Sequence, residues 1–355
     1  MKSKKNTLVS RAAVGCVTTA IFLLLCIIKG IYPFGTATLD TVDFQSQWIP
    51  AYYHVWDVLH GDGSAFFDWR VGGGNNFAGV SAQFSLLSPF NLFFLFVKRS
   101  WIEKSMIVFI IIKLLAMGYS MRWFLKEQVL GEERYGVYIL AGSVGYAVNG
   151  YTLLYYGMGW LDVAAILPLL CYFFCGMAER EGDWRPGKNT LGYIVCLTLV
   201  FIINIPQAYM MCFFLIVFAG GYFFLNRQGQ PLKKNGILKF GLTSLLSLGL
   251  SAVIFLPAAM AMLGSFRLSG EEYRGISGYF LLLRQDGMDA VWKWVILGSV
   301  AVPLLFFIIS GRRKREHIWQ WYLVAAMVLP VLFEAVNLIW HRGTYVCFPM
   351  RYSYM

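Results

Sequence analysis

Two carboxylates and two amides stand close together in an otherwise apolar chain, directly after its first membrane-length segment. They are Asp40, Asp43, Gln45 and Gln47. A carboxylate beside a lipid phase can act as a general base on a hydroxyl group, and side-chain amides can hydrogen-bond sugar hydroxyls. An aspartate before a helix is also a common N-cap, and the amides are ordinary loop residues. The spacing alone leaves both interpretations open.

Lys113 is the most unusual charge in the sequence, because it lies near the middle of the apolar run Ile107–Met121. A charged side chain at such a position costs roughly 2.5–3.5 kcal/mol on insertion scales, so it usually faces a cavity or a partner. Glu334 and a phosphate group entering from the lipid are the two candidate partners. The alternative is that the lysine reaches the interface along its apolar stem.

Further polar groups lie at the ends of apolar segments. Trp160-Leu161-Asp162 is one, and Trp340-His341-Arg342-Gly343 with Phe348-Pro349-Met350-Arg351-Tyr352 is another. The arginine guanidinium is a planar fork that suits phosphate. The alternatives are a solvated loop acid in the first case and an interfacial belt of aromatic and basic residues in the second.

The composition is that of a chain that crosses a membrane several times. Hydrophobic residues make up 58% of it, charged residues 14%, and the mean hydropathy is +0.59; a soluble domain would carry about 25% charged residues. The net charge of +11 lies mainly in short loops, which argues against nucleic acid binding. Six of the seven cysteines fall inside apolar segments, so the sequence contains neither a disulfide framework nor a CxxC metal site.

We therefore predict an all-α polytopic membrane protein with about nine spans. The segments long enough to cross are roughly 12–32, 104–124, 136–156, 161–178, 190–206, 207–225, 237–263, 291–310 and 318–339. The first is interpreted as a retained anchor rather than a cleaved signal peptide. Pro206 predicts a tight turn between two antiparallel helices.

The distribution of basic residues predicts the orientation. With a cytoplasmic N-terminus, seventeen of the thirty Lys and Arg residues fall in inner segments and eight in outer ones. The outer side then carries 33–103, 264–290 and 340–355. In the first of these, aromatic residues recur at helical spacing over 49–59, which predicts a helix lying in the interface plane. A glycine-rich turn follows at 72–76.

An ordered set of short motifs runs along nearly the whole chain. These are Phe34-Gly35, Asp43 with Gln47, Trp69 with Gly72–Phe77, Ser88-Pro89-Phe90-Asn91-Leu92, Trp160-Leu161-Asp162, Trp340-His341, Phe348-Pro349 and Arg351-Tyr352. Each is weak alone, but in this order and spacing the set resembles the YfhO family of bacterial membrane proteins.

The resemblance implies a glycosyltransferase of the GT-C superfold, with a large first outer loop that carries a catalytic aspartate. It implies a polyprenyl-phosphate sugar as donor and a cell-envelope polymer as acceptor, teichoic acid in Gram-positive members. Asp43 matches the first-loop acid best, and Asp40 is a looser match. Family members have further spans, so the chain is expected to be the N-terminal portion of a longer member, with a single membrane domain over 1–355.

These considerations give a set of expected site residues. The catalytic candidates are Asp43 and Asp40; the substrate-binding candidates are Gln47, Trp69, Asn76, Asp162 and His341; the donor-phosphate candidates are Arg351 and Lys113. The two aspartates are too sparse to establish a metal site, so a divalent cation stays open. A flippase that moves the lipid-linked sugar, with Lys113 and Glu334 as a gate, and a non-catalytic assembly subunit are the alternative functions.

Overall fold

The computed structural model describes residues 2–39, 43–71, 73–76, 84–130, 132–180, 186–225, 234–263, 318–341 and 351–355. Most of them are helical, as expected for an all-α membrane protein. The described residues also form one short antiparallel ladder, in which β1 (Phe67–Asp68) pairs with β2 (Asn75–Asn76). The chain forms two compact units, and each is described by itself.

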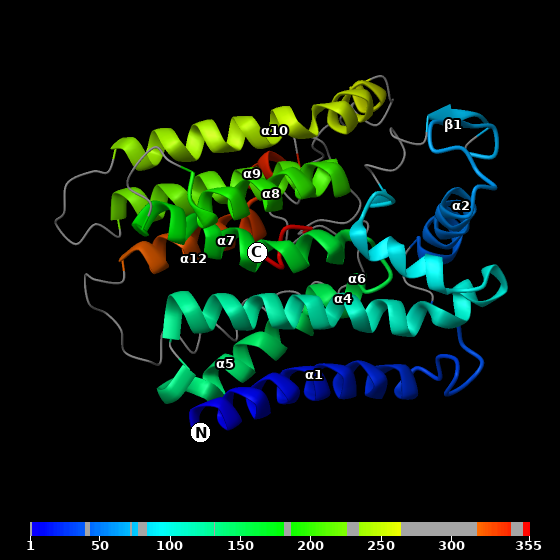
Figure 1. The fold of residues 1–355 in the computed structure, drawn as a ribbon, viewed down its shortest axis with the longest axis horizontal. Helices are drawn as coiled ribbons and strands as arrows, with labels where there is room; N and C mark the ends of the chain where they lie inside the picture. Colours follow the sequence, from blue (N-terminus) through cyan, green and yellow to red (C-terminus); the bar gives the residue numbers. More distant parts are fainter. Residues whose placement is uncertain are drawn as a thin grey trace. The chain divides into compact units, whose positions relative to one another are not determined.

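The first unit comprises 1–148, 152–205 and 242–261. Within it, α7 packs against α4 and α8, and α1 packs against α4 and α5 (Figure 1). Its elements, apart from the ladder, are α1 (Lys2–Ile28), η1 (Phe44–Trp48), α2 (Ile49–Leu59), η2 (Pro89–Phe96), η3 (Arg99–Trp101), α4 (Ile102–Phe124), η4 (Leu125–Leu130), α5 (Glu132–Ala147), most of α6 (Gly150–Tyr155), α7 (Trp160–Arg180), α8 (Lys188–Ile203) and part of α10 (Lys234–Leu263).

Two glycines allow α7 and α8 to pack closely. A Cβ atom on Gly176 would lie 2.6 Å from the Asn189 side chain, and one on Gly192 would lie 2.5 Å from the Phe173 ring. Small residues that let helix backbones approach are typical of membrane helix pairs, where van der Waals packing drives association. A larger side chain at either position would therefore require the Asn189 side chain or the Phe173 ring to move.

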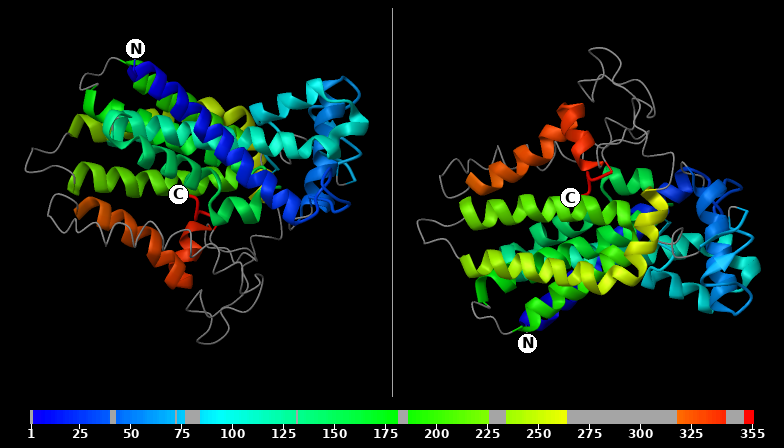
Figure 2. Two further views of the ribbon diagram at one scale, coloured as in Figure 1. Left: turned by 90° about the horizontal axis from the view of Figure 1, so that it is seen from below. Right: turned by 90° about the horizontal axis from the view of Figure 1, so that it is seen from above.

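The described residues between 43 and 101 gather at the end of the first unit where α1 ends and α4 begins (Figures 1 and 2). The predicted helix over 49–59 is confirmed as α2, with Pro50 in its first turn. Tyr52 on this helix is buried against Phe94 and Phe109, with ring centroids 5.2 and 5.4 Å away, so this ring packs on protein. The placement of α2 in the interface plane stays a prediction.

The second unit comprises 149–151, 206–241 and 262–355. Its main described elements are α9 (Ile205–Gly220), η5 (Gly221–Leu225), α12 (Ile318–Leu332) and α13 (Glu334–Trp340). The Trp340 ring packs on Phe213 and on Tyr352, with centroids 4.7 and 4.8 Å apart. The Tyr322 ring covers Gly221, where a Cβ atom would lie 2.9 Å from it.

Five helices in the described part of the chain are long and apolar enough to cross a membrane, by length and composition. They are Arg11–Ile28, Gly136–Tyr155, Trp160–Glu179, Ile205–Leu225 and Asn235–Met260, and Lys188–Ile203 and Trp321–Pro330 are shorter apolar helices. The predicted span 104–124 is helical as α4, whereas 291–310 lies outside the described residues. Near the predicted turn, α8 ends at Ile203, Asn204 is extended, and α9 begins at Ile205 with Pro206 in its first turn.

Candidate functional site

Asp43 occupies the N-cap position of η1, yet its side chain does not cap the helix. Its main-chain carbonyl oxygen accepts hydrogen bonds from the amides of Gln47 and Trp48, at 2.9 and 3.4 Å. The carboxylate is half-buried and makes no hydrogen bond or ion pair with any described residue. The capping interpretation of this aspartate therefore does not hold in the structure.

The helix that follows Asp43 is anchored by buried aromatic rings. Trp48 packs on Phe84 and Tyr52, with ring centroids 5.3 and 6.2 Å away. A Cβ atom on Gly159 would lie 2.5 Å from the Trp48 ring, so only glycine fits directly before Trp160. Aromatic side chains bury a large apolar area and have few rotatable bonds. Asp43 thus precedes a helix that the packing of Trp48 holds in place.

The buried lysine of α4 pairs with an acid of α7. The Lys113 Nζ atom lies 2.7 Å from Asp162 Oδ1, and the two side chains are 2% and 0% exposed. The same Nζ atom lies 4.2 Å from the centre of the Phe109 ring and 5.8 Å from that of Tyr52. Ser88 interacts with the Asp162 carboxylate. This pair joins α4, α7 and the segment that precedes η2.

The ion pair revises the expectations for both residues. A partner for Lys113 was predicted, and the structure shows that Asp162 is one. The side chain of the predicted candidate Glu334 lies outside the described part of the chain. The lysine charge is already balanced, which disfavours its use as a phosphate ligand. Asp162 is buried, so it is not a solvated loop acid. Its role in substrate binding stays a prediction.

Buried amides secure the segment around η2, and they were not expected in the site from the sequence. The Asn91 Nδ2 group donates to the carbonyl oxygens of Ser85 and Leu86, both at 2.9 Å. The Asn204 amide at the end of α8 donates to the Ser85 hydroxyl at 3.1 Å. The Ser88-Pro89-Phe90-Asn91 motif was the available signal: Ser88 caps η2 by accepting from the amide of Phe90. These hydrogen bonds hold the segment around η2 in place.

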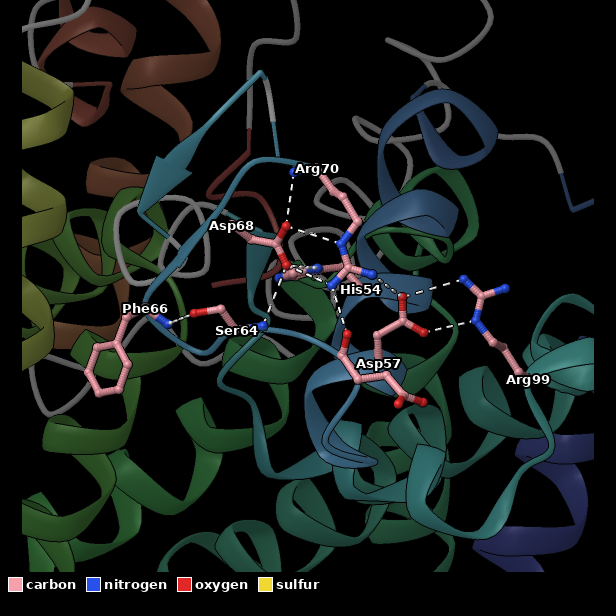
Figure 3. Close-up of polar contacts among 8 residues, drawn as sticks. His54, Asp57, Ser64, Phe66, Asp68, Arg70 and Arg99 are labelled. Carbon is pink, nitrogen blue, oxygen red and sulfur yellow. Dashed lines mark hydrogen bonds and ion pairs between the residues drawn. The ribbon is translucent and has the colours of Figure 1, made fainter.

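A second polar cluster joins α2 to the loops that follow it (Figure 3). Arg70 Nη2 lies 2.7 Å from Asp68 Oδ2, and its Nη1 lies 3.4 Å from Asp57 Oδ2. Arg99 Nε donates to Asp57 Oδ1 at 2.8 Å. Hydrogen bonds from the side chain and main chain of Arg70 hold the pKa of Asp68 well below its usual range. This cluster was not predicted from the sequence. The available signal was the short spacing of Asp68 and Arg70, two oppositely charged residues.

Trp69 projects from this cluster and is 75% exposed. Its ring packs edge-on against Phe67, with centroids 5.1 Å apart, and covers Gly74. Gly74 has a φ of +114°, and a Cβ atom there would lie 2.7 Å from the Trp69 ring, so the turn requires glycine. Asn76 pairs with Phe67 through the ladder. Sugar binding by Trp69, Asn76 and the half-buried Gln47 stays a prediction.

Two motifs near the end of the chain, Trp340-His341 and Arg351-Tyr352, meet in the second unit. His341 is buried, and its Nδ1 atom lies 2.7 Å from the carbonyl oxygen of Asn337. Tyr352 packs on His341 with ring centroids 5.7 Å apart, and Arg351 beside it is half-buried. The Tyr354 hydroxyl donates to Gln207 Oε1 at 3.1 Å. Asp43 and Asp162 belong to the first unit, and Asp40 lies outside the described residues.

The comparisons with known proteins bear on the family. The family model described as bacterial membrane protein YfhO matches residues 15–355. The chain belongs to the YfhO family. A search of curated proteins and a search of solved structures found no match. The YfhO match covers every residue expected in the site, from Asp40 to Arg351, and it agrees with the apolar helices in placing the chain in a membrane. Among the described residues, no group of three or more His, Cys, Asp and Glu is arranged to hold a metal ion.

The Arg70 cluster is predicted to loosen in mild acid. His54 is buried, with Nδ1 3.8 Å from Asp68 Oδ2. Burial lowers the pKa of His54; Arg70 lowers it further, whereas Asp68 and Asp57 oppose the shift. A free histidine has a pKa of about 6.5. The stability that neutral His54 contributes to the folded cluster is therefore complete above that pH, and it is lost as the pH falls through the lower pKa of the folded state.

Hydrogen–deuterium exchange measures this loosening. Peptides covering 54–71 should exchange faster at about pH 5 than at about pH 7.5, after correction for intrinsic rates. His54→Gln should remove most of that difference. An unchanged pH dependence in the variant would assign the effect to other groups.

Proposed function

We propose that this chain is a membrane glycosyltransferase of the GT-C type. It would transfer a sugar from a polyprenyl-phosphate donor to a hydroxyl of an envelope glycopolymer, such as teichoic acid, on the extracytoplasmic side. The observation that carries the proposal is the half-buried carboxylate of Asp43, which no described residue neutralises. A general base needs a carboxylate that is ordered and available to accept a proton.

Neighbouring carboxylates differ from Asp43 in this respect. Arg70 and Arg99 bind Asp57, Arg70 also binds Asp68, and Lys113 binds Asp162. An ion pair stabilises the charged form of a carboxylate and weakens it as a base. Asp43 is therefore the best supported base among these acids, with Asp40 in a supporting role.

The proposed step is a direct displacement at the anomeric carbon of the donor sugar. The acceptor oxygen forms the new bond to this carbon while its proton passes to Asp43. The bond from the carbon to the phosphate oxygen breaks, and the lipid phosphate leaves with the electron pair. Negative charge develops on that phosphate, so a fixed cation favours the step. Arg351 is the proposed cation because its guanidinium presents two parallel donors to phosphate oxygens.

We assign sugar recognition to an aromatic ring and to hydrogen-bonding side chains. Trp69 offers an exposed aromatic face, and Gln47, Asn76 and His341 offer donors and acceptors for hydroxyl groups. Membership of the YfhO family and the membrane-length helices support a substrate that is presented from the bilayer.

Reconstitution in liposomes with a polyprenyl-phosphate sugar and purified teichoic acid tests the proposal. We expect free polyprenyl phosphate to appear in equal amount to the sugar found on the polymer by mass spectrometry. A flippase would leave the donor intact and move it between leaflets. An assembly subunit would change neither the donor nor its distribution, and either outcome would overturn the proposal.

A further inference from the structure

The short helices η2 and η3 expose a set of large apolar side chains. Phe96 is 87% exposed, and the others that are exposed are Leu92, Leu95 and Trp101. The opposite face of η2 is buried through Asn91 and Phe94, so the element is firmly held. Because its inner face is fixed, the outer apolar residues project to the surroundings of the protein.

Two lysines accompany these apolar residues. Lys98 and Lys104 are both exposed, and the Nζ atom of Lys104 lies 5.5 Å from the centre of the Trp101 ring. Arg99 lies between them in sequence but is bound to Asp57. The neighbouring acid Glu103 accepts a hydrogen bond from the Tyr53 hydroxyl. The element therefore presents two cationic groups beside an apolar surface.

The helix that follows shows which way this surface faces. Lys104, Val108 and Ile112 recur every four residues, so they share one face of α4, and all three are exposed. In a membrane protein of the YfhO family, exposed apolar side chains on a helix of 23 residues are expected to face lipid, and Val108 and Ile112 are such side chains. Lys104 lies on that same face at the start of α4, and Trp101 precedes it, as is typical of the headgroup level.

We propose that residues 89–104, which comprise η2, η3 and the first turn of α4, form a binding site for anionic phospholipid headgroups. The exposed Leu92, Leu95 and Phe96 would lie among acyl chains, while Lys98 and Lys104 pair with the headgroup phosphate, whose negative charge no headgroup cation balances in an anionic lipid. The exposed face and its charge carry this proposal, which is independent of the proposed glycosyltransferase activity.

Native mass spectrometry of the detergent-purified protein, with phosphatidylglycerol or phosphatidylcholine as probes, tests the site. We expect tighter binding of phosphatidylglycerol, reduced roughly 25-fold in Lys98→Gln/Lys104→Gln, because each lysine contributes roughly a factor of five at an anionic surface. Lys98→Arg/Lys104→Arg should keep the binding.

The matched control is Lys126→Gln/Lys188→Gln. Lys126 pairs with Glu127 at 3.1 Å, and Lys188 is exposed at the start of α8. This variant removes the same number of charges elsewhere and should bind phosphatidylglycerol as the wild type does. Equal binding of both lipids by the wild type, or an equal loss in the control, would overturn the proposal.

Discussion

Replacing Asp43 with asparagine is expected to lower the rate of sugar transfer by about 10²–10⁴-fold, the usual contribution of a general base. The amide has the shape of the carboxylate but accepts no proton at neutral pH. The carboxylate makes neither a cap nor an ion pair with any described residue, so its loss should leave the fold intact. The reduction should fall on kcat, with little change in KM for the donor.

Transfer by purified Asp43→Asn, measured as released polyprenyl phosphate, checks this result. Asp62→Asn is the matched control, because Asp62 is an exposed aspartate shortly after α2 and contributes its main-chain carbonyl to Arg70. The control should transfer sugar at the wild-type rate. Full activity of Asp43→Asn would remove Asp43 from the mechanism, and the proposed step would need another base.

Replacing one residue of the buried Lys113–Asp162 ion pair is expected to destabilise the protein more than replacing both residues. Lys113→Met leaves Asp162 buried without its counter-charge, which should destabilise the protein by about 3–5 kcal/mol. The double variant Lys113→Met/Asp162→Leu replaces both charges by apolar groups of similar size. It should recover most of the lost stability, because no uncompensated charge then remains in the interior.

Thermal unfolding in detergent compares Lys113→Met, Asp162→Leu, the double variant and the wild type. Lys104→Met is the matched control, since Lys104 lies on the same helix but is exposed, and its melting temperature should stay close to that of the wild type. If the single variants do not fold, a higher yield of folded protein for the double variant would support the prediction. A double variant no better than the weaker single variant would mean that the ion pair is not the origin of the coupling.

The membrane-length helices were predictable from sequence, because a bilayer demands long apolar segments with internal hydrogen bonds. The need of Lys113 for a partner was also predictable from its position. Its partner was not, since Asp162 lies on another helix and meets Lys113 only through the packing of α7 on α4. Helix pairing of this kind depends on side-chain fit, which hydropathy does not record.

The packing of Tyr52 on α2 shows a second limit of sequence reasoning. The aromatic spacing correctly predicted a helix, but lipid and a protein interior both favour an apolar face. Tyr52 therefore gives the same signal whether it contacts acyl chains or, as in this fold, Phe109. The role of Asp43 had a similar ambiguity, because a capping aspartate and an available one look alike in sequence.

The Lys113–Asp162 pair also constrains the order in which the protein is assembled in its membrane. Lys113 leaves the ribosome 49 residues before Asp162. During that interval α4 carries an unbalanced charge at a depth where lysine is costly. We expect the helix to be held at the translocation channel, or by an insertase, until α7 arrives. A protein truncated before α7 should consequently remain crosslinked to that machinery, whereas one extended beyond α7 should be released into the lipid.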